Sequence, residues 1–432
     1  MIRPYCCIAL LTVALAGGST PLAIGDERSR GTIEVKFPST DWPWWRGPSR
    51  DGVAPAGPST AIVWSESKGI VWKTSVPGRG HGSPTVVGDQ VVLATADEKE
   101  ETQSVLCFAR DSGDLQWSTE VHRGGLEKDA NDKSSRASST LACDGQRFFV
   151  NFLNQGFVHT TALNRDGTHA WQTEITPYVT HQGFGSSPAV YGRLVIVSAD
   201  TKRGGVICGL DRETGNKVWT VSRPKKPNYV SPIILNVAGR DQLILTGCDL
   251  IASLDPLSGN KIWELEGATT ECVTSAVTDG ERVFSSGGYP SNHVQAVRAD
   301  GSREVAWRNG VRVYVPSMII RDDHIYAVTD AGIATCWKSA TGDEVWKGRL
   351  GGTFSSSPVL AGEYIYATNE AGKTSVFKAQ SSGFELVAQN QLGNEVFATP
   401  AICDGRIYLR VATRRAGKRS ETLYCIAEST KR

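Results

Sequence analysis

Short runs of alternating apolar and polar residues recur along the chain, and a small hydroxylated residue usually opens each run. In Pro188–Val197, for example, apolar positions alternate and Gly192 supplies the turn of a hairpin. Equivalent openings occur at Ser83-Pro84, Ser139-Thr140, Ser187-Pro188, Ser231-Pro232, Ser275-Ala276, Pro316-Ser317, Ser357-Pro358 and Thr399-Pro400. Because a period of two is typical of half-buried strands, this pattern predicts an all-β repeat protein.

A second phrase follows each opening: a small residue, a strand, a turn with glycine, and then tryptophan. It is clearest in Leu210–Trp219 and returns about 44 residues later in Leu254–Trp263. Other copies end at Trp117, Trp171, Trp307 and Trp346, whereas the copy around Ser382-Gly383-Phe384 lacks its tryptophan. Each unit therefore contains four short strands, and a period near forty residues is typical of a propeller blade.

The two ends of the chain complement each other. Eight openings predict eight units, but the last unit stops after Leu423–Ala427 without its fourth strand. A strand with no blade of its own, Gly69–Val76, lies at the other end and carries Trp72. Pairing the two removes exposed sheet edges. The sequence thus predicts an eight-bladed β-propeller of four-stranded antiparallel blades, closed by its N- and C-terminal strands, with Trp72 near Tyr424.

The repeated tryptophans have a predicted structural role. On an outer strand an indole can pack across the seam to the neighbouring blade, which we expect for Trp72, Trp117, Trp171, Trp219, Trp263, Trp307 and Trp346. Cysteines occupy repeat-equivalent small positions, as at Cys107, Cys336 and Cys425. We therefore expect them to be mostly buried free thiols rather than bridged pairs.

The N-terminal region predicts export. Arg3 precedes an apolar run, Ile8–Leu15, that is too short to span a bilayer, and small residues follow it. We interpret 1–23 as a signal peptide, 24–68 as an extension with a Trp/Pro-rich latch at Trp42–Trp45, and 69–432 as the propeller. Later residues contain no membrane-spanning run, and a net charge of +1 gives no general attraction to nucleic acid. The destination is the periplasm or the cell exterior.

These phrases resemble the PQQ-like (pyrroloquinoline-quinone-type) repeat family, whose motif reads roughly Ala-x-Asp-x-x-Thr-Gly-Lys-x-x-Trp. Gly209–Trp219 and Ser253–Trp263 fit that spacing, and the resemblance covers about Gly69–Ala427. The opening Asp41–Pro48 is similar to the start of many secreted PQQ-like proteins of unassigned role. The resemblance implies a propeller and leaves function open, because the family includes both quinoprotein alcohol dehydrogenases and BamB, which has no cofactor.

The residues that a quinone-dependent dehydrogenase of this family would need are not evident. Such enzymes use an adjacent cysteine pair, a calcium ion and an aspartate base, yet the adjacent pair here is Cys6-Cys7, within the predicted signal. No acidic cluster stands out as a calcium site, and the seven histidines never form a two-ligand spacing. We therefore expect no catalytic residue, no metal and no cofactor, with PQQ and calcium as the alternative.

The segments just before each opening are the candidate binding surface, because equivalent positions of a propeller converge on one mouth of its channel. They carry polar and aromatic groups that suit a small ligand or a peptide: Arg79, His81, Arg136, His181, Gln182, Tyr229, Glu271, Arg312, Tyr314 and Glu395, together with Phe184, Phe354 and Phe397.

Three functional hypotheses follow. The first is an exported, non-catalytic propeller scaffold that binds a protein or a small ligand at the channel mouth or blade edges. The second is a quinone-dependent dehydrogenase. The third is a carbohydrate-binding module that uses Trp42, Trp44 and Trp45, since flat apolar faces suit sugar rings. The identity of the ligand or partner and the oligomeric state do not follow from the sequence.

Overall fold

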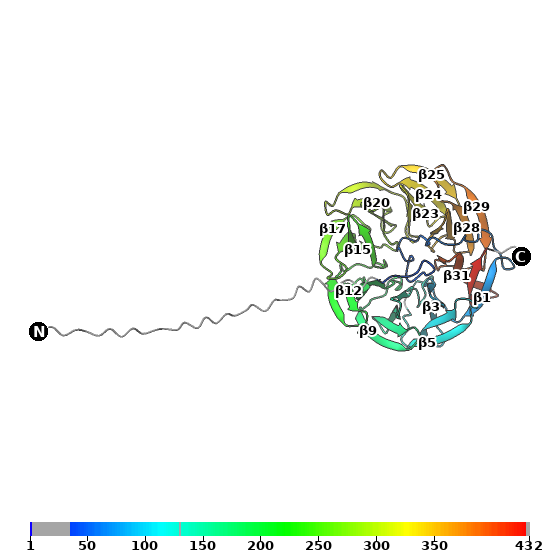
Figure 1. Ribbon diagram of the computed structural model, residues 1–432, viewed down its shortest axis with the longest axis horizontal. Helices are drawn as coiled ribbons and strands as arrows, with labels where there is room; N and C mark the ends of the chain where they lie inside the picture. Colours follow the sequence, from blue (N-terminus) through cyan, green and yellow to red (C-terminus); the bar gives the residue numbers. More distant parts are fainter. Residues whose placement is uncertain (2–34, 129–130, 429–432) are drawn as a thin grey trace. The chain divides into compact units, whose positions relative to one another are not determined.

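The computed structural model describes residue 1, residues 35–128 and residues 131–428. The predicted signal peptide and the Cys6-Cys7 pair, Met1 apart, lie outside the described residues. Eight four-stranded antiparallel sheets are arranged in a ring (Figure 1), and no helix occurs among the described residues. The prediction of an all-β, eight-bladed propeller is confirmed.

The strands of blades 1 to 4 follow chain order from the channel outward. They are β2 (Thr85–Val87), β3 (Gln90–Asp97), β4 (Thr102–Ala109), β5 (Leu115–Arg123), β6 (Ala142–Cys143), β7 (Arg147–Asn154), β8 (Phe157–Asn164), β9 (His169–Pro177), β10 (Ala189–Tyr191), β11 (Leu194–Ala199), β12 (Val206–Asp211), β13 (Lys217–Ser222), β14 (Ile233–Val237), β15 (Arg240–Gly247), β16 (Leu250–Leu254) and β17 (Lys261–Glu266).

Blades 5 to 8 repeat the arrangement, and the outer strand of blade 8 comes from the other end of the chain. The strands are β18 (Val277–Thr278), β19 (Arg282–Gly287), β20 (His293–Arg298), β21 (Val305–Asn309), β22 (Ile319–Arg321), β23 (His324–Val328), β24 (Ile333–Lys338), β25 (Glu344–Arg349), β26 (Val359–Ala361), β27 (Tyr364–Thr368), β28 (Lys373–Lys378), β29 (Leu386–Gln391), β30 (Ala401–Cys403), β31 (Arg406–Arg415), β32 (Lys418–Ala427) and β1 (Ile70–Val76).

Closure of the ring is the antiparallel pairing of β1 with β32. Trp72 pairs with Cys425 and Lys73 with Tyr424, which confirms that the two ends of the chain share one sheet, with Trp72 near Tyr424. The backbone N–H of Ala427 donates to the carbonyl of Gly69 at 2.9 Å, which extends the pairing by one residue. β1 is therefore the fourth strand of the sheet that β30, β31 and β32 form, and it completes blade 8.

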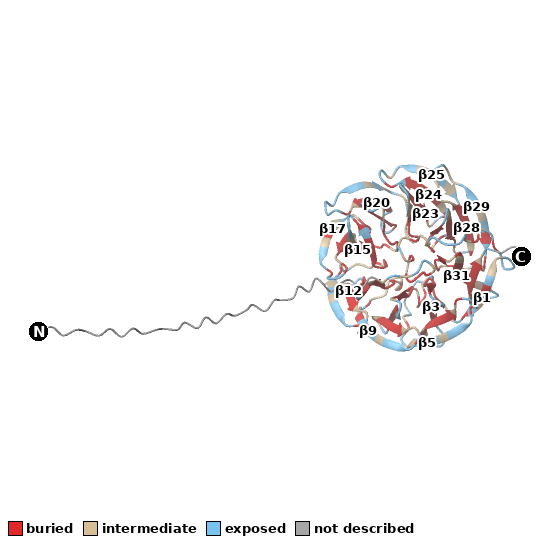
Figure 2. Cartoon of the chain, in the orientation of Figure 1, coloured by how far each residue is buried: buried red, intermediate tan, exposed pale blue. Residues whose placement is uncertain are grey.

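Burial decreases from the channel outward. The three inner strands of each blade are largely buried, whereas outer strands such as β5 and β13 alternate between exposed and half-buried residues (Figure 2). The apolar side chains of the middle strands therefore form the core between neighbouring blades, and the outer strands carry most of the solvated surface. The eight described cysteines are free and buried inside the blades.

Most of the repeat tryptophans contact the next blade. The indole N–H of Trp72 donates to the carbonyl of Arg110 at 2.9 Å, and that of Trp171 to Arg212 at 3.0 Å. A glycine in the same turn lies beneath each of these two rings, Gly113 under Trp72 and Gly215 under Trp171. A Cβ on Gly215 would lie 2.7 Å from the Trp171 indole, and this glycine also has a φ of +75°, so a side chain is disfavoured twice.

Trp263 differs from the other repeat tryptophans. It is fully buried, and its indole N–H donates to Oε1 of Gln242, in its own blade, at 2.8 Å. The amide of Gln242 in turn donates to the carbonyl of Ala299 in blade 5 at 3.0 Å. The seam between blades 4 and 5 is therefore hydrogen-bonded through a glutamine, not directly by the indole.

Blade 7 lacks its own tryptophan, and Trp64 of the N-terminal segment takes that place. Its ring stacks on Tyr366, with 6.3 Å between centroids, as Trp72 packs on Tyr408 and Trp346 on Tyr326 in their blades. The backbone N–H of Trp64 donates to Oδ1 of Asn390 on β29 at 2.8 Å. The degenerate repeat is therefore completed by a residue from outside the repeats.

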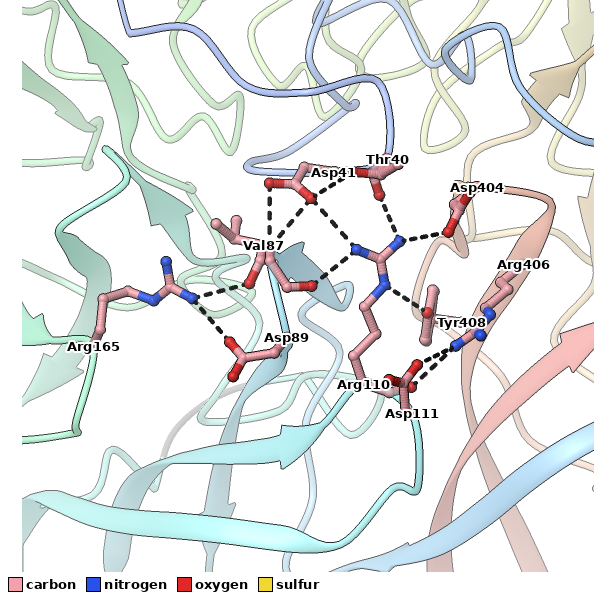
Figure 3. Close-up of polar contacts among 11 residues, drawn as sticks. Thr40, Asp41, Val87, Asp89, Arg110, Asp111, Arg165, Asp404, Arg406 and Tyr408 are labelled. Carbon is pink, nitrogen blue, oxygen red and sulfur yellow. Dashed lines mark hydrogen bonds and ion pairs between the residues drawn. The ribbon is translucent and has the colours of Figure 1, made fainter.

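Arg110 joins the closing seam to the N-terminal segment (Figure 3). Its guanidinium donates to the carbonyls of Thr40 and Gly88 at 2.7 and 2.9 Å and to the Tyr408 hydroxyl at 3.2 Å. Asp41 lies 3.4 Å from the same guanidinium. One side chain of blade 1 thus bonds to blade 8 and to the chain segment that precedes the propeller.

Trp64→Ala should destabilise the whole propeller, because it empties a buried ring site at the seam between blades 7 and 8. Loss of a buried tryptophan costs about 3–5 kcal/mol, and the side chain is only 3% exposed. Urea unfolding followed by intrinsic fluorescence would measure the change. Val63→Ala is the matched control, since Val63 is 54% exposed and should leave the midpoint unchanged. An unchanged midpoint in the Trp64 variant would contradict this assignment.

Candidate functional site

The N-terminal segment forms a cap across one end of the channel, between residues 41 and 54. It appears dark blue at the centre of the ring in Figure 1. Trp42 pairs with Val86 of β2, and the carbonyl of Pro43 accepts from the N–H of Cys143. In blade 7 the N–H of Ala54 donates to the carbonyl of Leu360 at 2.7 Å. The cap therefore contacts blades 1, 2 and 7.

Arg46 holds the cap to blades 6 and 7. Its guanidinium donates to the carbonyls of Met318 and Pro358 at 2.5 and 3.1 Å, and to that of Asp51 at 2.6 Å. The side chain is fully buried, and burial lowers its pKa to about 10. Gly52 lies against this guanidinium, where a Cβ would come within 2.4 Å of it.

A belt of hydroxyl side chains encircles the channel beside the cap. The backbone N–H of one blade's belt residue donates to the hydroxyl of the next at 2.9–3.0 Å, at six of the eight seams within the described residues. The belt consists of Ser83, Thr140, Ser187, Ser231, Ser275, Ser317, Ser357 and Thr399. The hydroxylated residue that opens each repeat is therefore the contact that links neighbouring blades around the channel.

A layer of aromatic and small side chains lies two or three residues before each belt residue, toward the mouth. Together with six of the eight belt residues, all but Ser275 and Ser317, it surrounds a cavity of about 600 Å³, and Trp45 of the cap lines the same cavity. The aromatic members are Phe184, Tyr229, Tyr314, Phe354 and Phe397. The Trp45 indole N–H is engaged, because it donates to the hydroxyl of Ser275 at 2.8 Å.

Five of the ten predicted binding residues line this cavity. They are His81, Gln182, Tyr229, Arg312 and Tyr314, and the three predicted phenylalanines line it as well. Arg312 lies over the Tyr314 ring, 5.0 Å from its centroid, and donates to the carbonyl of Gly288 at 2.9 Å.

His181 and Glu271 lie next to the cavity without lining it. Glu271 is buried and accepts from the Tyr314 hydroxyl at 3.3 Å, and its other oxygen lies 3.3 Å from Nε2 of His181. Lys202 donates to Nδ1 of His181 at 2.9 Å. Glu271 therefore holds the Tyr314 hydroxyl, and His181 contacts Glu271.

The remaining three predicted residues have other roles. Arg79 donates to the carbonyl of Asp132 at 3.2 Å, and Arg136 lines a small separate hollow beside Glu127. Glu395 forms ion pairs with Arg419 at 2.6 Å and Arg414 at 3.2 Å. Their positions in the repeats predicted that all three side chains lie at the mouth of the channel. Instead, these long side chains contact neighbouring residues and do not line the cavity.

Three buried polar atoms on the cavity wall lack a hydrogen-bond partner among the described residues. They are Nε2 of His81, the hydroxyl of Ser83 and the hydroxyl of Tyr229. Burial, together with Arg79, Arg410 and Arg419, holds the pKa of His81 well below 6.5. The His81 ring is therefore neutral at pH 7, and it stacks on Phe397 with 4.4 Å between centroids. A buried polar group without a partner favours a ligand that supplies one.

Sequence reasoning missed the charged groups at the rim of the cavity. Asp330 and Glu370 lie in equivalent turns, Asp330-Ala331-Gly332 and Glu370-Ala371-Gly372, and that repetition was the signal that could have found them. Lys133, from the insertion before blade 2, donates to Glu370 at 2.8 Å. Trp42 and Trp44 are buried, so the expectation that all three tryptophans of the latch offer sugar-stacking faces is wrong for these two.

The lining residues do not fit PQQ with calcium. PQQ carries several carboxylates, but the two cations on the wall, Lys133 and Arg312, are already bonded to Glu370 and to the Gly288 carbonyl. Calcium takes six to eight oxygen ligands. Asp330 accepts from the Tyr314 N–H, and within the described ranges no group of three His, Cys, Asp or Glu residues could hold a metal.

A family model gives a match over most of the chain. The model of the outer membrane protein assembly factor BamB matches residues 47–176 and 101–348, which together span 302 of 432 residues. A search of the curated proteins finds no match. The part of the chain that the structure describes contains no helix that could cross a membrane.

Solved structures share the fold at low identity. BamB from Moraxella catarrhalis has a TM-score of 0.60 at 14% identity, with 82% of this chain and 99% of that chain covered. A europium-containing methanol dehydrogenase has a TM-score of 0.66 at 11% identity, covering 92% and 99%. The quinohemoprotein alcohol dehydrogenase from Comamonas testosteroni has 0.63 at 12%, covering 91% and 81%. These likenesses establish the fold and leave function open.

His81 should make the protein less stable as the pH falls. Its pKa is lowered in the folded state, so below about pH 6.5 the unfolded chain binds a proton that the folded chain does not. Stability then falls with decreasing pH, by at most about 1.4 kcal/mol per pH unit for one proton. His81→Gln should remove this part of the acid sensitivity in urea titrations between pH 7 and pH 5. His169→Gln, at an exposed position, is the control. Equal slopes for His81→Gln and the parent would refute the role.

Proposed function

The chain belongs to the family of the outer membrane protein assembly factor BamB, and on this basis we propose that it is an exported, non-catalytic propeller that binds a small ligand in its capped channel. The ligand enters at the mouth and meets the aromatic layer, then the hydroxyl belt, and finally Trp45. Residues of the wall bind and orient it, and no bond of the ligand is broken.

One observation carries the proposal: the channel contains an open cavity with polar and aromatic side chains on its wall, and it is not filled by packed apolar side chains. Its volume of about 600 Å³ lies within the usual range for small-molecule sites. Its wall combines aromatic faces with buried polar atoms that have no partner among the described residues, as at Ser83 and Tyr229. The seams between blades, by contrast, are closely packed with apolar side chains and leave no space for a ligand.

Two features of the chain support export. Arg3 and the short apolar run Ile8–Leu15 have the pattern of a secretory signal, and the family is described by an outer membrane assembly factor. The cysteines do not oppose this, since the eight described thiols are buried. Burial raises their pKa, to about 12 for Cys107, so they remain thiols and react slowly with oxidants.

Val273→Trp should block the cavity and abolish ligand binding. Val273 lies on the wall two residues before Ser275, the position that Tyr229 holds before Ser231, so a large ring fits the backbone there. Thermal-shift screening of the parent against sugars, peptides, nucleotides, divalent cations and PQQ should give at least one hit that the variant loses.

Val305→Trp is the matched control, because the same substitution then falls on the exposed outer strand β21, where Val305 is 42% exposed. It should keep every hit. Val315→Trp, in the neighbouring blade 6, is a second blocking variant should Val273→Trp melt early. Hits that survive both blocking variants would place binding outside the channel, and the proposal would fail.

A further inference from the structure

The hydroxyl belt presents unused hydrogen-bond donors to the cavity. The hydroxyls of Thr140, Ser187 and Ser231 each accept a backbone N–H at 2.9 Å, and within the described residues their own O–H groups have no acceptor. Ser83 is 2% exposed, and its hydroxyl has no partner of either kind in the described part of the chain. A ligand at the belt therefore needs oxygen atoms that accept several hydrogen bonds at close spacing.

The wall nearer the mouth presents flat apolar faces together with groups that accept hydrogen bonds. The partly exposed rings of Phe184 and Phe397 line the cavity beside Tyr229. Asp330 and Glu370 lie on the same wall and can each accept further O–H groups, since a carboxylate has about four lone-pair positions. The matching ligand therefore has ring faces rich in C–H groups and an edge that both donates and accepts hydrogen bonds.

Charge on the wall is balanced. The cations Lys133 and Arg312 are matched by Asp330 and Glu370, and His81 is held neutral. Phosphate or polycarboxylate ligands are usually bound by unpaired Arg or Lys, and here Lys133 is already paired with Glu370. The arrangement disfavours a strongly charged ligand, and a purely apolar ligand would leave the belt hydroxyls unsatisfied.

Taking the proposed function as its premise, we infer that the ligand is a neutral oligosaccharide that inserts end-on. Its terminal ring reaches the hydroxyl belt above Trp45, and the C–H faces of the following rings lie against the aromatic layer. Sugar hydroxyls both donate and accept, which satisfies the belt and the rim carboxylates together. The sequence hypothesis assigned sugar stacking to three N-terminal tryptophans. Here the sugar binds inside the channel, and Trp45 is the one of the three that lines the cavity.

Isothermal titration calorimetry with cellotriose, maltotriose and tri-N-acetylchitotriose tests the inference, with trigalacturonate as the acidic counterpart. At least one neutral trisaccharide should bind the full-length protein and lose binding in Val273→Trp. Trigalacturonate should bind more weakly, because the wall offers its carboxylates no unpaired cation.

Tyr229→Phe removes one unpartnered hydroxyl and keeps the ring, so affinity for the bound sugar should fall about fivefold, the effect of a single hydrogen bond. Tyr289→Phe is the matched control, since Tyr289 is 56% exposed and does not line the cavity; it should leave affinity unchanged. Melting curves of both variants check that the fold is retained.

The outcomes separate this inference from the proposed function. If no neutral sugar binds but another compound does, and Val273→Trp abolishes that binding, the carbohydrate inference is wrong and the channel remains a binding site. Tighter binding of trigalacturonate, or sugar binding that Val273→Trp leaves intact, would also overturn the inference. If no compound of any class binds, the proposed function itself fails.

Discussion

The antiparallel pairing of β1 with β32 holds the two ends of the propeller in one sheet, and the other features of the molecule depend on it. Lys73 opposite Tyr424 sets the register, and the Trp72 indole then reaches blade 1 through the carbonyl of Arg110. Without this sheet, blade 8 would expose an unpaired edge and the seam to blade 1 would lose its tryptophan. The channel exists as an enclosed space because this pairing closes the ring around it.

The same chain end that closes the ring also closes the channel. Before β1, the chain passes Arg46, which is buried among carbonyls of blades 6 and 7, and Trp64, which completes blade 7. Each of these side chains supplies a feature that the repeats lack. Arg46 anchors the cap that closes one end of the channel, and Trp64 provides the missing tryptophan of blade 7. The segment before the repeats is therefore part of the folded core, and its removal would affect both stability and the cavity.

The cavity lies where equivalent positions of the eight repeats surround the channel, and differences among the repeats determine the chemistry of its wall. The belt hydroxyls lie at equivalent positions of all eight blades and, at six of the eight seams within the described residues, accept a backbone N–H from the neighbouring blade. Two or three residues before them, the repeats differ, with His81, Tyr229 or Val273 at the equivalent position. The belt residues are thus alike in all eight repeats, whereas the side chains of the layer beside them differ. These differing side chains determine which ligand the channel can bind.

The sequence by itself determined the strand pattern, the count of eight blades and their closure, because these follow from local periodicity and from complementary gaps at the chain ends. Half of the ten binding residues that it predicted, His81 and Tyr229 among them, line the cavity, since equivalent repeat positions converge on the channel. The tertiary structure alone decided the direction of long side chains: Glu395 turns to Arg419, and Glu271 to Tyr314 and His181. It alone revealed the floor of the channel and the Trp64 replacement, because both bring together residues that no repeat or spacing relates.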